Sequence, residues 1–197
     1  IGGVLGDIQI NLPFFFAAGL SALTLIFVAA VLPESLKKGR GGEAPGPSPG
    51  RWAALNRRTV PLYLVAFLVT FSLAGLEATF AFLADQRLGL TSRSVGYVFA
   101  VMGMTGALVQ GGLVGRLRPL LGEDRMILAG LLVSGVGMGG IAVAGSPVQA
   151  TIALSIFAAA HGLIRPGNAS LITQRAGVGH GLAIRLLYSM DSLGRVL

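Results

Sequence analysis

The sequence predicts an all-α protein, a polytopic bundle of transmembrane helices. Of its 197 residues, 53% are hydrophobic and only 12% are charged, and the mean hydropathy is +0.77. A soluble domain carries about 25% charged residues, so this chain has too few charges to cover a globule in water. No stretch alternates with the period of two that a membrane barrel requires. Soluble enzymes, disordered chains and disulfide-rich secreted modules are therefore disfavoured.

The net charge of +7 predicts contact with a lipid bilayer rather than with nucleic acid. A nucleic-acid-binding surface places its bases along one face of a folded domain. Here the bases stand at the ends of apolar segments, where lipid headgroups lie. The chain has no cysteine and only two histidines, which leaves little to bind a metal. We expect no cofactor, no metal site and no nucleic-acid partner.

Five apolar stretches are long enough to cross a membrane. A hydrocarbon core of about 30 Å requires roughly 20 helical residues at about 1.5 Å of rise each. Residues 1–6 resemble the tail of another helix, and a last apolar stretch begins near Gly181 and runs to the end of the chain. The five predicted spans are residues 13–32, 60–84, 94–114, 126–144 and 147–171.

Basic residues mark alternate loops and predict the orientation. They follow the first, third and fifth spans, whereas the other loops carry few bases. By the positive-inside rule the basic loops are cytoplasmic, which predicts a multi-pass protein of the cell inner membrane. The bases that support this orientation are Lys37, Lys38, Arg40, Arg51, Arg57, Arg58, Arg116, Arg118, Arg125 and Arg175.

A linker divides the chain into two parts. Residues 39–50 contain five glycines and three prolines, a composition typical of a flexible linker. Residues 52–58 are expected to lie along the headgroups as a short helix. We therefore expect residues 1–33 to end an N-terminal bundle, residues 34–59 to form a cytoplasmic linker, and residues 60–197 to form most of a C-terminal bundle.

Small residues predict where helices pack. In lipid, helices associate through the close approach of small side chains. Stripes of this kind occur on three spans, and each is expected either to pack statically or to let helices slide. The longest has a period of four, and its members are Gly103, Ala107, Gly111 and Gly115. The shorter stripes consist of Gly135 and Gly139, and of Ala150, Ala158 and Gly162.

Glu77 is the first candidate for a functional residue. It is the only acidic or basic side chain between residues 60 and 84, and an ionised carboxylate near the bilayer centre costs at least about 2.5 kcal/mol. It must therefore face a water-filled cavity, contact a partner or be protonated. This behaviour suits a group that binds protons or a cationic substrate. The alternative is a structural carboxylic acid that hydrogen-bonds to a neighbouring helix.

His161 and Arg165 stand four residues apart and share a face of the fifth span. Pro166 removes a backbone hydrogen bond and predicts a kink there, which would suit a cytoplasmic gate. Arg165 and Glu77 are expected to lie about 16 Å apart along the membrane normal, too far for an ion pair. Arg165 then either snorkels toward the headgroups or holds the gate. His161 either carries protons or is a packed, hydrogen-bonded residue.

Three further polar residues occur in apolar surroundings. Gln110 stands alone in the third span, where a hydrogen bond between helices is favoured over contact with substrate. Asp191 and Arg195 share one helix face, so a pair between them would lower the cost of carrying both into lipid. We expect these two residues to have a structural or gating role.

Short motifs occur along the whole chain in a fixed order. They are Ile1-Gly2-Gly3, Pro13-Phe14-Phe15, Leu32-Pro33-Glu34-Ser35, residues 76–80, 86–91, 95–96 and 115–125, and residues 192–197. Together they resemble the major facilitator superfamily, and within it the drug:proton antiporters that include the tetracycline exporters. The resemblance implies a fragment truncated at both ends, from the end of helix five to the start of helix eleven. Such a fragment needs the missing helices of the same full-length chain to transport.

The resemblance also concerns residues 115–125, which are similar to a loop motif of this family. It implies that Arg118 and Arg125 help to clamp the cytoplasmic ends of neighbouring helices in one conformational state. Arg118 stands where the family often has an aspartate, and ordinary anchoring by the positive-inside rule explains the same bases equally well.

The resemblance implies a secondary active transporter that exports small amphipathic molecules or drugs against proton entry. Its two bundles would rock about a site at the membrane midplane, with a small molecule and protons as partners. An importer or uniporter of a sugar or metabolite, and a non-transporting membrane scaffold, remain alternatives. An intramembrane enzyme lacks support, because the sequence has no His-Glu-x-x-His motif and no catalytic dyad in adjacent spans.

Overall fold

The computed structural model describes residues 2–31, 54–177 and 180–197. These residues are helical and contain no strand, which confirms the predicted all-α class. The predicted linker falls largely on residues 32–53, which lie outside the described residues. The helices are α1 (Gly2–Ile8), α2 (Leu12–Val31), α3 (Val60–Leu88), α4 (Ser92–Leu108), a π-helix η1 (Val109–Leu113), α5 (Val114–Leu121), α6 (Glu123–Val143), α7 (Pro147–Arg175) and α8 (His180–Val196).

Five helical stretches are long and apolar enough to cross a membrane, and they match the five predicted spans. The third stretch differs most, because α4, η1 and α5 form one unbroken run, Ser92–Leu121. Residues 116–121 were expected in a loop and are helical instead. The chain turns only at Gly122, whose φ of 75° is a conformation that residues with a Cβ rarely adopt.

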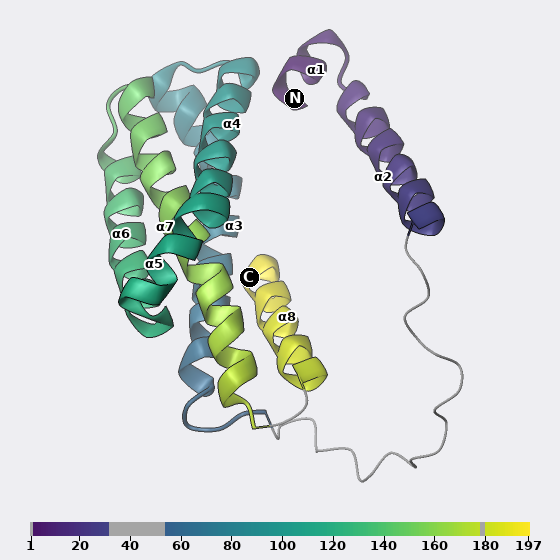
Figure 1. Cartoon of the computed structure of the whole chain (residues 1–197). Helices are drawn as coiled ribbons and strands as arrows, with labels where there is room; N and C mark the ends of the chain where they lie inside the picture. The colour runs from purple at the N-terminus through teal and green to yellow at the C-terminus, as the bar shows by residue number, and fades with distance from the viewer. Residues whose placement is uncertain (1, 32–53, 178–179) are drawn as a thin grey trace.

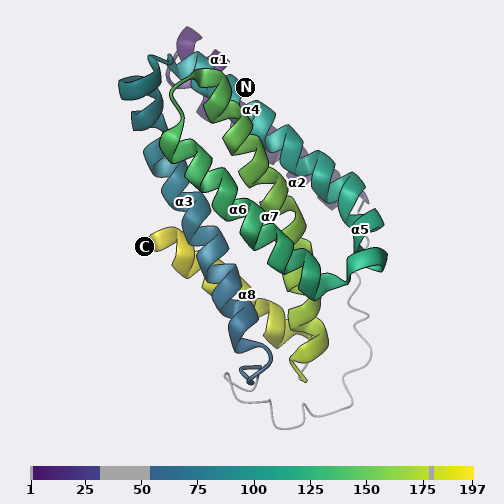
Figure 2. The same ribbon diagram turned by 90° about the vertical axis from the view of Figure 1, so that its left-hand side faces the viewer.

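Helix α7 lies at the centre of the bundle formed by α3 to α8 (Figures 1 and 2). It packs against α6, α4, α3 and α8, and it contributes more buried residues than any other described helix. Helix α2 stands apart from this bundle in Figure 1 and has no buried residue. Helix α1 packs on the start of α4, where Gly3 lies against Ser92 and Gly96.

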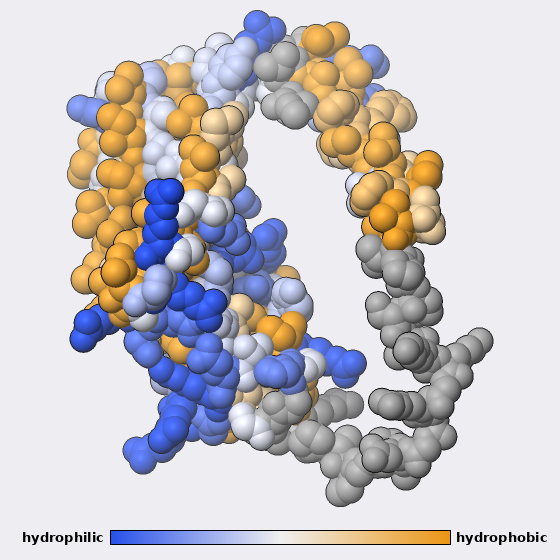
Figure 3. Space-filling view, in the orientation of Figure 1, coloured by the Kyte–Doolittle hydropathy of each residue, from blue (hydrophilic) through white to orange (hydrophobic). Residues whose placement is uncertain are grey.

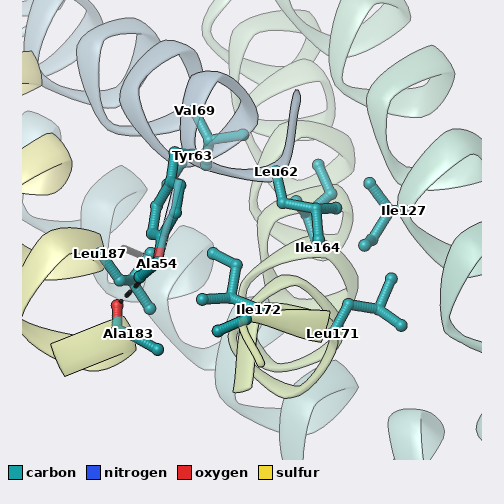
Figure 4. Packing of buried hydrophobic residues seen from close by; sticks show 12 residues of the cluster. Ala54, Leu62, Tyr63, Val69, Ile127, Ile164, Leu171, Ile172, Ala183 and Leu187 are labelled. Carbon is teal, nitrogen blue, oxygen red and sulfur yellow. Dashed lines mark hydrogen bonds between the residues drawn. The ribbon is translucent and has the colours of Figure 1, made fainter. Parts of the chain in front are cut away.

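The core of the bundle has two parts along its length. One part joins α3, α6, α7 and α8, and it includes Ile164 and Ile172 together with Tyr63, whose hydroxyl donates to Ala183 O at 3.2 Å (Figure 4). The other part joins α3, α4, α6 and α7, and it is centred on Phe80 and Phe157. The cavities described below open beside these two parts.

A side-chain turn precedes α3 in place of the short interfacial helix expected at residues 52–58. Of that segment, residues 54–58 are described and none of them is helical. The Asn56 side chain accepts hydrogen bonds from the backbone N–H groups of Arg58 and Thr59 at 2.8 and 3.0 Å, which favours a turn over a helix. Its Nδ2 also donates to Arg175 O at 2.9 Å. The turn thereby ties the start of α3 to the end of α7.

The bases gather at one end of the bundle, which we call the basic end. Here α3 begins, α5 meets α6 and α7 ends (Figures 1 and 2). Hydrophilic residues concentrate at this end in the space-filling view, whereas hydrophobic residues cover the length of the outer helix faces (Figure 3). This segregation is what a bilayer requires of a multi-pass protein.

The glycines that bring helices together differ from most of those expected. No atom of another described helix comes within 4 Å of a Cβ built at Gly103, Gly111, Gly115, Gly135 or Gly139, so these glycines do not pack against a neighbouring helix here. The close contacts lie on adjacent faces of the same helices. A Cβ at Gly137 would lie 2.7 Å from Phe157 N, and one at Gly162 would lie 2.9 Å from Gly106 O. The contact at Gly162 agrees with the stripe expected on α7, whose other members Ala150 and Ala158 are also buried.

We expect Gly137→Ala to lower the stability of the protein by about 1–3 kcal/mol, as overpacking does. The added methyl group would lie 2.9 Å from the Phe157 Cα, and a backbone atom cannot move aside as a flexible side chain can. The measurement is the temperature at which detergent-solubilised protein loses its monodisperse elution. Gly135→Ala is the matched control, because a Cβ there meets nothing within 4 Å. Equal midpoints for the two variants would contradict the close approach of α6 and α7.

Candidate functional site

A cavity of about 640 Å³ opens between α3, α4 and α7. It brings together Glu77, Gln110, His161 and Arg165, which come from three separate predicted spans. Gly103 and Ala107 also line it, so half of the expected packing stripe faces open space instead of a helix. The remaining lining residues are Leu73, Phe99, Met102, Gly106, Ala158 and Gly162.

The packing of α3 places Glu77 in the wall of the cavity. Leu76 and Phe80 are spaced by four and are buried in the core. Leu73 and Glu77 are spaced in the same way on the neighbouring face, and both line the cavity. Successive helical residues are about 100° apart, so burial of Leu76 turns Glu77 into the opening. Among the described side chains, none forms an ion pair with this carboxylate.

His161 is packed, but it is not hydrogen-bonded as the structural alternative required. It is only 7% exposed, and its ring lies 4.1 Å from the Phe157 ring, centroid to centroid. Neither ring nitrogen has a hydrogen-bond partner among the described residues. A buried polar group without a partner costs about 1–3 kcal/mol. Because His161 lines the cavity, a molecule bound there can supply that partner.

Gln110 lies in the π-helix η1, a feature that the sequence analysis missed. The extra residue in this turn interrupts the regular α-helical hydrogen-bonding pattern. In the sequence, the adjacent pair Gly111-Gly112 was the one feature that could have indicated an irregular helix here. Its side chain makes no hydrogen bond to another helix in the described part of the chain, so the favoured expectation is not met. Gln110 lines the cavity instead, and π-helical turns of this kind often occur at functional sites.

Arg165 pairs with Asp191, and the expected pair between Asp191 and Arg195 does not form. Arg165 Nη2 lies 3.7 Å from Asp191 Oδ2, and Thr70 Oγ1 donates to Asp191 Oδ1 at 2.8 Å. Helix α8 packs along α3 with Gly194 against the Phe67 backbone, which brings Asp191 to Thr70. Arg165 is thus held by an acid and is not simply reaching for the headgroups. Pro166 lies within α7, which continues through it.

A polar cluster at the basic end holds the junction of α5 and α6 against α7. Arg118 forms an ion pair with the nearly buried Glu123 and donates to Ser170 Oγ at 3.1 Å. Gln174 Nε2 donates to Glu123 Oε2 at 3.1 Å. Beside this cluster, Arg175 forms an ion pair with Asp124 at 2.6 Å, while Arg125 is exposed. The contacts of Arg118 agree with a clamp, and they lie within this bundle.

Metal-ligating side chains do not gather in the described part of the chain, where no group of three or more His, Asp or Glu residues occurs. The chemistry of the cavity is therefore that of one carboxylate, one amide, one imidazole and one guanidinium in an apolar wall. Such a set can bind a small molecule and can accept or release a proton, and among the described lining residues it offers no nucleophile with an adjacent base.

Residues 1–197 match a family model described as the Major Facilitator Superfamily. The chain is 28% identical to "Multidrug resistance protein 1" of Bacillus subtilis (strain 168) over 200 residues, which cover 100% of this chain and 50% of that protein. It is 28% identical to "Tetracycline resistance protein, class E" of Escherichia coli over 203 residues, again 100% of this chain and 50% of that protein. The chain thus spans about half the length of these curated relatives.

The absence of cysteine allows a direct test of whether the cavity holds water. We expect Ala107→Cys, in the cavity wall, to react with a charged thiosulfonate in membranes at least about tenfold faster than Leu132→Cys. Leu132 is 68% exposed on α6, on the face expected to meet lipid. The thiolate is the reactive form of cysteine, and it does not form in hydrocarbon. The readout is the rate of labelling, followed by mass spectrometry. Equal rates would mean that lipid fills the cavity.

Proposed function

Because the chain belongs to the Major Facilitator Superfamily, we propose that it forms part of a secondary active transporter that exports small amphipathic molecules in exchange for protons. The observation that carries this proposal is the 640 Å³ cavity, in which Glu77 is the only carboxylate among the described lining residues. The printed names of two similar proteins, multidrug resistance and tetracycline resistance proteins, support export of a drug-like molecule.

The cavity wall fits a molecule with an apolar body and few polar groups. Pockets for drug-sized ligands occupy about 300–1,000 Å³ and are mostly apolar with a few placed polar groups. Here Leu73, Phe99 and Met102 supply apolar surface. Methionine adapts to ligands of different shape, and the Phe99 ring can stack on an aromatic or cationic group.

Glu77 is the proposed site at which substrate and proton compete. A carboxylate in an apolar cavity binds either a cation or a proton, and binding one disfavours the other. Gln110 and His161 would orient the substrate through hydrogen bonds, since the ring nitrogens of His161 lack a partner among the described residues. Competition at this one carboxylate is sufficient to exchange substrate for a proton as the cavity opens to the two sides of the membrane in turn.

The orientation and the division of the chain follow from charge placement. We propose that the basic end faces the cytoplasm, because bases there meet anionic headgroups. Residues 1–33 and 60–197 would belong to two bundles that rock about the cavity, and further helices would close it on the side away from α7. The Arg118 contacts, Arg125, Pro166 in α7, and Arg195 are proposed to act as cytoplasmic gating elements.

We expect Glu77→Gln to slow export of a lipophilic cation at least about tenfold, because the amide neither binds a proton nor attracts a cation. The assay uses the complete protein in inverted membrane vesicles, with ethidium fluorescence as the readout. Asp85→Asn is the matched control, since Asp85 lies exposed on the same helix outside the cavity lining.

A protonophore added to the same vesicles tests the direction of coupling. Export driven by protons stops when the gradient collapses, whereas an uncoupled carrier continues to equilibrate ethidium. Unchanged export by Glu77→Gln would remove Glu77 from the mechanism. If export persists without a proton gradient, the protein is a uniporter and not a proton antiporter.

A further inference from the structure

A second, smaller cavity of about 150 Å³ lies between α3, α7 and α8. Its polar lining consists of Arg165, Asn168, Tyr188 and Asp191, and the rest of the wall is aliphatic. A cavity that holds one water molecule needs only about 10–15 Å³, so this one is large enough for several. It lies beside the first cavity, and Arg165 is the one residue that lines both.

Asn168 indicates that the second cavity takes up a hydrogen-bond donor. Its side chain is 2% exposed, and its Nδ2 donates to Leu62 O at 3.0 Å. This hydrogen bond fixes which end of the amide carries the oxygen. Asn168 Oδ1 is buried and has no partner in the described part of the chain, which costs about 1–3 kcal/mol unless a donor binds there. Water or a hydrated proton supplies that donor.

Among the residues that the structure describes, Asp191 is the only carboxylate that lines the second cavity. Helix α3 presents no charged group to it: its contact is the Thr70 hydroxyl, which donates at 2.8 Å, and its other lining residues are Ala66 and Val69. Helix α7 presents Arg165, 3.7 Å away. On α8 itself, Tyr188 is the remaining titratable group of the wall. The charge of Asp191 is therefore balanced by a single guanidinium.

The distance of 3.7 Å makes this a loose ion pair, longer than a charge-assisted hydrogen bond of about 2.7–2.9 Å. The Arg165 side chain is also 48% exposed. When a proton binds Asp191, the carboxylate becomes neutral and the Coulomb attraction that holds the guanidinium is lost. Arg165 keeps its own proton, so the positive charge is then free to face the first cavity. The only new bond is the O–H bond on Asp191.

We propose that Asp191 is a second proton-binding group and that Arg165 couples it to the substrate cavity. This inference rests on the proposed function. Proton uptake by Asp191 releases the Arg165 guanidinium, whose positive charge repels a cationic substrate held near Glu77 and lowers its affinity. Proton release restores the pair and favours rebinding. Two carboxylates on different helices thus respond to one substrate.

The test counts the protons that the complete protein releases when it binds tetraphenylphosphonium, a lipophilic cation. Purified protein in lipid nanodiscs is mixed with the cation in weak buffer, and a pH-indicator dye reports the protons. We expect Asp191→Asn to release about half as many protons per bound cation as the unmodified protein, because one of two coupled groups is removed. Asp85→Asn, the matched control, releases the same number as the unmodified protein.

Arg165 variants separate coupling from a merely structural role. We expect Arg165→Gln to reduce proton release to the level of Asp191→Asn, and the double variant to reduce it no further, because both act in one pathway. Arg165→Lys keeps the charge and is expected to restore most of the release. It also serves as the second test if Arg165→Gln fails to fold.

Three outcomes decide the inference. The inference is overturned if Asp191→Asn releases as many protons as the unmodified protein. It is also overturned if the double variant loses the sum of the proton release that the two single variants lose. If the unmodified protein neither binds tetraphenylphosphonium nor releases protons, the proposed function itself fails. Since that failure appears in the protein without any substitution, it is distinguishable from failure of the role of Asp191.

Discussion

The cost of a charge in hydrocarbon governs this structure more than any other interaction. A helix satisfies its own backbone hydrogen bonds in lipid, but an ionised side chain needs water or an opposite charge. The described bundle meets this need in three ways. Most bases lie at one end, Arg165 and Asp191 pair across two helices, and Glu77 faces a cavity. Each solution keeps a charge in contact with water or with an opposite charge.

Helix α7 packs against every other long helix of the bundle. It therefore lies next to the helices that carry Glu77 and Asp191. Its position depends on close glycine contacts, since a Cβ at Gly137 of α6 would meet the Phe157 backbone and a Cβ at Gly162 of α7 itself would meet Gly106 O of α4. Close packing holds the helix while its Arg165 side stays open to two cavities. We propose that this arrangement lets Arg165 link a proton-binding group to a substrate.

The polar groups without partners are as informative as the pairs. His161 and Asn168 are both buried, and each carries atoms that no described residue satisfies. They lie on the same helix but line different cavities. Since an unsatisfied buried group is costly, each cavity is suited to hold water or a polar group of a bound molecule. The two cavities therefore differ in kind, one large and mostly apolar, the other small enough for water and protons.

The sequence alone determined the five spans and the set of bases at one end, because span length and charge segregation are local properties of the chain. The family resemblance came from short motifs in a fixed order along the chain. The sequence also singled out Glu77, Gln110, His161 and Arg165, since a lone polar residue in an apolar run is conspicuous. Only the tertiary structure decided that Asp191 pairs with Arg165 rather than Arg195 and that Gly106 packs where Gly103 was expected. Both depend on the rotation of each helix about its axis and on the neighbour it meets, which the sequence of one helix does not specify.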